Sequence, residues 1–290
     1  MRKVVDTNFL QTEALRAYLA ASTDNYAVLT EFAAMESYRQ DVLDTLDALN
    51  KQMGVLVQFP TQVIVLKGTL DVCSLSGRDA ATRERMIGET QTREFPEFCQ
   101  HLLAARRGDL SIREQIIENG REASANLDRI LSGSSTLSRG IEQLQQTYTP
   151  TELKSLRQRK GLTLQLQDKL IRDVLSLAGE LMEQHPSVMD IPRDPQIRNT
   201  FLFRFALCAS VSILKRIEEG GAGKVNDENL RNDMVDVNFA AFATYFDGLF
   251  TDDKRAADTY ARSEYLLREM FAIPPPWSLA SLIAWWRGRT

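Results

Sequence analysis

Acidic residues from two distant parts of the chain have the types and positions needed to hold divalent metal ions. Asp6 follows two valines, and Asp252 and Asp253 follow the short apolar segment 248–251. Each acid is expected at the C-terminal end of a short buried strand. If the two strands are neighbours in a parallel sheet, their carboxylates meet at one edge, which is where such sheets bind ligands. Carboxylate oxygens suit hard divalent cations, and two bound ions can promote phosphodiester hydrolysis.

Two helical segments carry further acids that can reach this edge. Glu36 lies one turn inside the predicted helix 31–49, and Asp233 and Asp236 lie near the start of the predicted helix 229–246. In an α/β unit a helix begins near the carboxyl edge of the sheet, so only acids in its N-terminal part can face that edge. Both helices meet this requirement in the sequence.

The pattern of apolar residues predicts an α/β fold that is interrupted by a long helical segment. Short β-branched or apolar runs predict strands, and apolar residues at helical spacing predict helices. Thr12 is a candidate N-cap of the first helix. The expected strands are residues 3–10, 26–30, 62–66 and 248–251, and the expected helices are residues 12–21, 31–49, 78–107, 111–131, 151–183, 194–219, 229–246 and 253–271. Strand–helix–strand connections of this kind produce a parallel sheet.

These elements divide the chain into a discontinuous α/β core and an all-helical insertion. Residues 1–74 and 224–272 form the two parts of the core, and residues 75–223 form the insertion, which ends in a glycine-rich segment. Residues 273–290 combine a run of prolines with bulky apolar side chains, which predicts a stiff tail docked on the protein itself. The alternatives for the tail are contact with a partner or a second copy and, last, a membrane-surface helix.

The order of these pieces resembles that of the PIN-domain nucleases, a family of metal-dependent ribonucleases. The similar pieces are the opening segment 5–8 (VDTN), a glutamate on the second helix, an aspartate near the start of a late helix, and the segment 251–253 after the following strand. The resemblance covers residues 1–72 and 224–272 and implies a PIN-like three-layer core around a parallel sheet. A helical insertion of this length departs from so compact a family.

The resemblance also implies a set of site residues. By it, four acids hold one or two Mg²⁺ or Mn²⁺ ions, and two polar residues support them. The four acids are Asp6, Glu36, Asp236 and Asp253, and the supporting residues are Asn8 and Thr251.

Three of the implied ligands have a competitor nearby. Asp233 competes with Asp236, and Asp252 competes with Asp253, so that Asp233 and Asp252 stay as supporting candidates. Glu31 competes with Glu36 but suits a helix N-terminus, where the helix dipole favours an acid. Any one of these aspartates taken alone has a structural alternative, because aspartate is a common turn or cap residue. The cluster as a whole favours a bound cation, since neighbouring carboxylates repel each other.

Charge and composition say less about the substrate and the location. The net charge is −4, which does not predict strong nucleic-acid binding. Residues 154–172 nevertheless hold six basic side chains and one acid, Asp168, which form either a solvated helix face or a surface that tracks phosphates. The candidate substrate-binding residues in this segment are Lys154, Arg157, Arg159 and Lys160.

The chain has three cysteines without CxxC spacing and two histidines. This favours a reducing, cytoplasmic location over a disulfide scaffold and gives poor support to a zinc site. The first residues lack the apolar core of a signal peptide, and no apolar run is long enough to span a bilayer, so no membrane span is expected.

The sequence therefore predicts metal-dependent phosphodiester hydrolysis of nucleic acid, RNA in preference to DNA, with Mg²⁺ or Mn²⁺ activating a water. The first alternative is a non-catalytic PIN-like interaction module, which binds a protein partner or a second copy through the helical insertion or the tail. The second alternative is a phosphatase-like hydrolase that uses the same acids on a small substrate.

Overall fold

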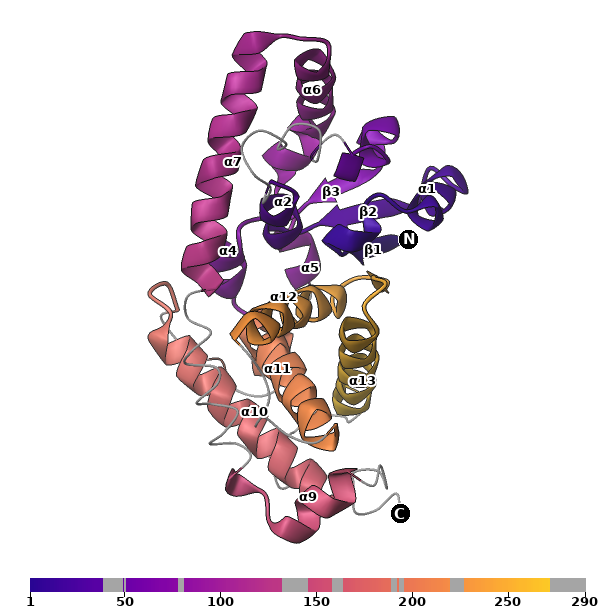
Figure 1. Ribbon diagram of the computed structural model, residues 1–290. Helices are drawn as coiled ribbons and strands as arrows, with labels where there is room; N and C mark the ends of the chain where they lie inside the picture. Colours follow the sequence, from indigo (N-terminus) through magenta and orange to yellow (C-terminus); the bar gives the residue numbers. More distant parts are fainter. Residues whose placement is uncertain are drawn as a thin grey trace. The chain divides into compact units, whose positions relative to one another are not determined.

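The computed structural model describes residues 1–38, 49, 51–77, 81–131, 146–157, 164–188, 192, 196–219 and 227–271. The chain divides into two compact units (Figure 1). The first unit consists of Met1–Val72, Arg83–Ser132 and Tyr245–Ala257. The second unit consists of Cys73–Thr82, Gly133–Thr244 and Asp258–Thr290.

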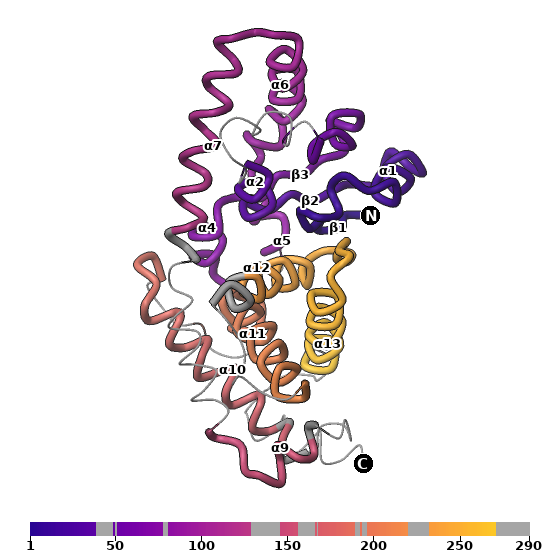
Figure 2. The backbone as a smooth tube through the Cα atoms, viewed as in Figure 1, coloured from indigo at the N-terminus to yellow at the C-terminus, as the bar shows by residue number. Residues whose placement is uncertain are grey.

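A four-stranded parallel sheet in the order β3-β2-β1-β4 forms the centre of the first unit. Its strands are β1 (Arg2–Val5), β2 (Tyr26–Leu29), β3 (Val63–Val65) and β4 (Leu249–Phe250). The late segment that holds β4 returns to lie beside β1, as the yellow-orange and indigo parts of Figure 2 show. The parallel α/β sheet predicted from the sequence is therefore confirmed. β1 has β2 on one side and β4 on the other, so the strand order reverses at β1.

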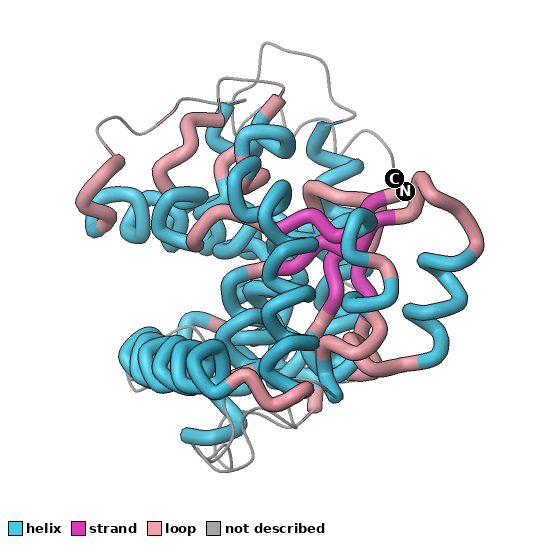
Figure 3. Tube along the Cα trace, turned by 90° about the horizontal axis from the view of Figure 1, so that it is seen from above, coloured by secondary structure: helices cyan, strands magenta, loops and turns pink. Residues whose placement is uncertain are grey.

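Apolar side chains explain why these short segments form strands in the middle of the unit. Val4, Val5 and Val28 are fully buried. Strands of a parallel sheet are covered on both faces, and they are accordingly rich in valine, isoleucine and leucine. Figure 3 shows the strands in magenta with helices around them.

The helices of the first unit follow the predicted positions in most cases. The hydroxyl of Thr12 accepts the N–H of Leu15, so the predicted N-cap of the first helix is confirmed. The longest two helices pack against each other as a hairpin that turns at Gly108, whose φ of 106° is left-handed. The helices are α1 (Glu13–Ala20), α2 (Glu31–Ser37), α4 (Thr69–Cys73), α5 (Thr82–Arg85), α6 (Glu89–Arg106) and α7 (Leu110–Leu131), and the 3₁₀ turns are η1 (Thr7–Phe9), η2 (Leu56–Gln58) and η3 (Pro60–Gln62).

The described part of the second unit is helical and is built around α11 (Phe201–Glu218). This helix is buried on nearly all sides, and it packs against α10 and α12. The rings of Phe201 and Phe242 lie 4.4 Å apart between α11 and α12. The other elements are α9 (Pro150–Arg157), α10 (Leu164–Gln184), η4 (Gln196–Asn199) and α12 (Asp227–Ala243), while α13 (Lys254–Phe271) begins in the first unit and continues in the second.

Several predicted elements are wrong in extent. The helix expected over residues 31–49 ends at Ser37, and the helix expected over residues 194–219 is a 3₁₀ turn followed by α11, which begins after the Thr200 cap. The strand expected over residues 3–10 ends at Val5, because the chain turns at Asp6 into η1, where the N–H of Phe9 bonds to the Asp6 carbonyl at 2.9 Å. The helix expected over residues 78–107 is broken before Glu89. There the N–H of Gly88 bonds to the Val65 carbonyl at 2.9 Å and ties the chain to the end of β3.

The boundaries of the two compact units differ from the boundaries predicted for the core and the insertion. Residues 83–132, from the segment expected as insertion, belong to the unit of the sheet, and α12 belongs to the helical unit. Contacts explain the first difference, because α6 packs on β3 and α7 packs on α2. The glycine-rich segment 220–223 and the tail 273–290 lie outside the described residues. The PIN-like core with its insertion stays a prediction.

The described residues also bear on the expectations about cysteines and membranes. Cys73, Cys99 and Cys208 are buried, and none of these three described residues forms a disulfide. Within the described ranges, none of the helices is both long enough and apolar enough to cross a membrane.

Candidate metal centre

The register of the sheet places Asp6 and Thr251 side by side at its carboxyl edge. Val5 of β1 pairs with Phe250 of β4, so the residues that follow on the two strands are cross-strand neighbours. The Asp6 N–H continues the ladder to the Phe250 carbonyl at 2.9 Å. The Thr251 hydroxyl donates to Oδ2 of Asp6 at 2.7 Å. In open α/β sheets this point, where the strand order reverses, is the usual place for a ligand.

Thr251 also connects Asp6 to the second acidic segment. Its hydroxyl oxygen accepts the backbone N–H of Asp253 at 3.0 Å. The structure thus brings Asp6 and Asp253 together around one hydroxyl group, as the sequence predicted for the two acids; their role as metal ligands stays a prediction. Asp252 is exposed to solvent, and none of these hydrogen bonds involves its side chain.

Asp253 has a structural role that the sequence analysis left as an alternative. Its Oδ1 accepts the N–H groups of Arg255 at 2.6 Å and Ala256 at 3.0 Å, which makes it the N-cap of α13. Aspartate and asparagine cap helices about equally well. The cap and the negative charge are therefore separable by substitution.

We expect Asp253→Ala to lower the free energy of unfolding by about 1 kcal/mol, because alanine cannot accept the two N–H groups. Asp253→Asn is expected to leave stability nearly unchanged, since the amide oxygen replaces the carboxylate oxygen. Urea denaturation of the two variants measures the difference. Equal losses in both variants would contradict the capping role.

Asp6 is a carboxyl group in a dry environment. Asp6 is only 4% exposed to solvent. Burial raises the pKa of Asp6 above the ordinary value of 3.8, and hydrogen bonds from the Thr251 hydroxyl and from the N–H groups of Asn8 and Thr7 oppose that rise. The negative charge of Asp253 raises the pKa further. Among the described residues no cationic side chain pairs with Asp6, so a bound cation would relieve both the burial of its charge and the repulsion.

Glu36 reaches the site through Thr7, a residue that the sequence analysis missed. The Thr7 hydroxyl donates to Oε2 of Glu36 at 2.5 Å. In a continuing strand Thr7 would point away from the face of Asp6. Because the chain turns into η1 directly after Asp6, Thr7 instead links the end of β1 to α2. A strand pattern gives no signal for such a turn.

Asn8 and Glu31 each take part in a hydrogen bond that involves a backbone N–H group. Asn8 is exposed, and its backbone N–H holds the Asp6 carboxylate. Glu31 opens α2, as the sequence analysis expected, and its Oε2 accepts the N–H of Thr69 at 2.7 Å. It therefore connects the start of α2 to the start of α4.

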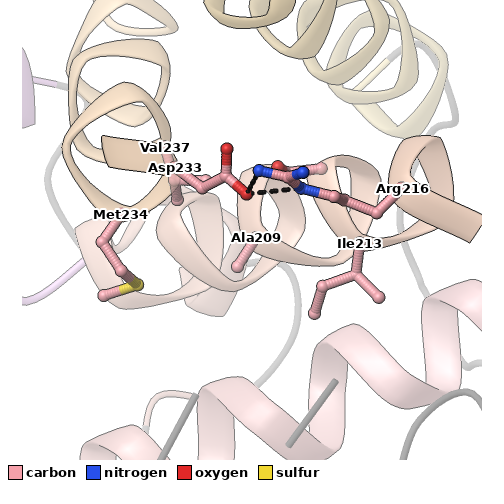
Figure 4. Close-up of a pocket in the computed structure, with 7 residues that line it drawn as sticks. Ala209, Ile213, Arg216, Asp233, Met234 and Val237 are labelled. Atoms are coloured by element: carbon pink, nitrogen blue, oxygen red, sulfur yellow. Dashed lines mark hydrogen bonds and ion pairs between the residues drawn. The ribbon is translucent and has the colours of Figure 1, made fainter. Parts of the chain in front are cut away.

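Asp233 and Asp236 lie in the second unit and in the middle of α12. The helix begins at Asp227, so the two acids occupy its second and third turns and not its start. Asp233 forms an ion pair with Arg216 of α11, at 2.7 Å from Nε and 2.5 Å from one terminal nitrogen (Figure 4). Only Asp6, Glu36 and Asp253 of the four implied ligands therefore belong to the unit of the sheet.

A small cavity adjoins the Arg216–Asp233 pair between α11 and α12 (Figure 4). Its volume is about 20 Å³, and apolar residues such as Ile213 and Met234 form part of its wall. A space of this size holds about one water molecule. It is too small to receive a nucleotide.

The predicted substrate-binding residues are only partly described. Lys154 is exposed on α9, and Arg157 ends that helix. Arg159 and Lys160 lie outside the described residues.

The described ranges contain no group of three or more histidine, cysteine, aspartate or glutamate side chains arranged to hold a metal ion. The carboxylates that the sheet brings together are a pair, Asp6 and Asp253, with Glu36 reached through Thr7. Comparison with protein families, with curated proteins and with solved structures finds no match to this chain.

Proposed function

We propose that this protein is a metal-dependent phosphodiesterase of PIN-like type that cleaves RNA internally. The observation that carries the proposal is the Thr251 hydroxyl, which donates to Asp6 and accepts the N–H of Asp253 at the point where the strand order reverses. The preference for RNA over DNA rests on the resemblance to the PIN-domain nucleases alone.

The chemistry of the donor set suits Mg²⁺ or Mn²⁺. All candidate ligands are carboxylates, and hard cations of this kind prefer oxygen. Mg²⁺ commonly binds through one or two protein carboxylates and completes its shell with water and substrate phosphate. Asp6 and Asp253 meet that need without a third acid. Asp6, Glu36 and Asp253 are the candidate ligands within the first unit, and Asp236, the fourth acid implied by the resemblance, lies in the second unit.

The chain's own residues have separate tasks in this proposal. When bound, the metal ion supplies a water of lowered pKa and stabilises charge on the phosphate. The Thr251 hydroxyl and the N–H groups of Thr7 and Asn8 fix the Asp6 carboxylate in one orientation. Such supporting hydrogen bonds typically contribute 10–100-fold to metal affinity. Thr7 holds Glu36 in the same way from the other side of the turn.

One observation favours a second candidate function, a non-catalytic interaction module on the same scaffold. The capping of α13 by Asp253 is enough to explain why this residue is an aspartate. The described residues also contain no group of three side chains arranged to hold a metal ion, only the Asp6–Asp253 pair. In that case a protein partner or a second copy would bind through the helical segments or the tail.

Adding and removing the metal distinguishes the two functions. With Mn²⁺ at about 100 times its dissociation constant we expect the free energy of unfolding to rise by about 2.7 kcal/mol. We also expect cleavage of a single-stranded RNA in the presence of Mn²⁺ or Mg²⁺, and the loss of both effects in EDTA. Thermal unfolding and gel analysis of a labelled RNA measure them. A protein that neither gains stability nor cleaves RNA with either ion is the interaction module.

A further inference from the structure

Lys67 lies at the same carboxyl edge of the sheet as Asp6. It comes directly after Leu66, which continues β3 by donating its N–H to the Leu29 carbonyl at 3.0 Å. The Lys67 N–H donates to the Met86 carbonyl at 2.9 Å, and Leu66 forms an antiparallel bridge with Ile87. The backbone of Leu66 is thus held by β2, and the backbone of Lys67 is held by the segment before α6.

The ammonium group of Lys67 has no acidic partner within the described residues. The side chain is half-buried. Some basic residues of the same unit are paired, such as Arg2 with Glu84 and Arg121 with Glu118. A half-buried lysine without a counter-ion is suited to an anion from solution, and lysine binds phosphate as a point charge.

The acid beside this segment is occupied by the backbone. Glu31 accepts the Thr69 N–H at 2.7 Å, and a Cβ added to Gly68 would lie 3.5 Å from Oε1 of Glu31. Its carboxylate therefore serves to hold the turn after β3.

The order of the strands sets the distance between Lys67 and the acidic pair. β3 is two strands from β1, and neighbouring strands lie about 4.8 Å apart, which gives roughly 10 Å along the edge. At about 3.4 Å per stacked nucleotide, that length corresponds to roughly three nucleotides. The edge thus carries the Asp6–Asp253 carboxylates at one end and the Lys67 ammonium group at the other, where the Glu31 carboxylate is bonded to the backbone.

We infer that Lys67 is a positioning residue that binds a backbone phosphate of the substrate, about three nucleotides from the bond that is cut. The inference rests on the proposed function and adds to it a substrate class, a single strand of several nucleotides lying along the sheet edge. Phosphate contacts of this kind hold the strand in register and carry no sequence information.

The test uses the full chain with Lys67→Gln, Lys67→Arg and a control, Lys51→Gln. Lys51 is an exposed lysine of the same unit, in the connection that leads into the amino end of β3. Binding of a fluorescent RNA octamer in EDTA is measured by anisotropy at several salt concentrations. For Lys67→Gln we expect a dissociation constant about tenfold higher, as for one lost charge-assisted hydrogen bond, and a salt slope smaller by about 0.7. Lys67→Arg is expected to stay close to the wild type, and so is the control.

Kinetics with Mn²⁺ test the position of the contact. For the octamer, Lys67→Gln should raise KM about tenfold and leave kcat within about twofold, because a contact equal in ground and transition states is lost. For a dinucleotide, which is too short to reach Lys67, the variant and the wild type should have the same KM.

The possible failures can be told apart. If the wild type cleaves the octamer and Lys67→Gln has the same KM and salt slope, the inference is overturned and the proposed function stands. If binding depends on Lys67 but no metal supports cleavage, the phosphate contact at Lys67 stands, and the catalytic proposal and the position relative to a cut bond are overturned. If the wild type does not bind the octamer at all, both are overturned.

Discussion

Asp6→Asn is expected to reduce metal-dependent RNA cleavage by more than about 100-fold, since even residues that only support a ligand contribute 10–100-fold. The variant should also lose the stabilisation that Mn²⁺ gives to the wild type. Asparagine has nearly the same shape and keeps one acceptor oxygen, so it retains part of the hydrogen bonding from the Thr251 hydroxyl and the N–H groups of Thr7 and Asn8. The change removes the charge, which is the property that a cation requires.

The same variant has an expected effect on stability without metal. Because burial and the charge of Asp253 raise the pKa of Asp6 in the folded state, the folded protein binds more protons than the unfolded chain between the ordinary pKa of 3.8 and the raised value. Stability falls with rising pH wherever the folded state binds more protons. The contribution of Asp6 to the free energy of unfolding therefore falls as the pH rises through this interval, and this contribution is absent in Asp6→Asn.

Urea denaturation between pH 3 and pH 8 measures this difference. In EDTA, Asp6→Asn should be more stable than the wild type at neutral pH, and the two curves should converge at the acidic end. A matched control is Asp128→Asn, which removes an exposed acid from α7 of the same unit. Full RNA cleavage by Asp6→Asn would refute the metal centre, whatever the stability curves show.

Arg216→Met is expected to lower the free energy of unfolding by about 3–5 kcal/mol, because it removes the guanidinium partner of a buried carboxylate. The side chains of Arg216 and Asp233 are only 13% and 10% exposed. Their contact connects α11 to α12, the two helices at the centre of the second unit. If the double variant Arg216→Met/Asp233→Leu recovers most of the loss, the cost comes from the charge that is left behind.

The control for this effect is the same substitution at a more exposed pair in the same unit. Arg268 pairs with Glu264 one turn earlier in α13, and their side chains are 76% and 28% exposed. An exposed ion pair contributes about 0–1 kcal/mol, so Arg268→Met should have little effect. Urea denaturation at pH 7 compares the variants, and similar losses at both positions would show that burial does not determine the cost at Arg216.

Parts of this arrangement could be predicted from the sequence because they depend on local pattern. The valines before Asp6 and the segment before Thr251 are apolar and short, as buried parallel strands are, and parallel strands place the residues after them at one edge. Thr12 was recognisable as a cap because it precedes a helical pattern of apolar residues. These inferences needed no knowledge of which elements pack together.

Other parts could not be predicted because they depend on contacts between distant segments. An apolar stripe on α6 or α7 shows that one face of the helix is buried, but it does not show that β3 and α2 are the elements packed against that face. Residues 227–232 contain a single apolar side chain, Leu230, so no repeated apolar spacing indicates that α12 begins at Asp227 and that Asp236 lies in its third turn. Thr7 is a small polar residue in a turn, and only the position of α2 makes it a partner of Glu36.

The pairing of β4 with β1 has a consequence during protein synthesis. Thr251 lies 245 residues after its partner Asp6. A nascent polypeptide that has not yet released β4 from the ribosome possesses the first carboxylate but neither the hydroxyl nor the second acid. Contacts between such remote segments form late. The carboxyl edge at Asp6 is thus incomplete while the chain is being translated, and it is completed only when β4 joins the sheet.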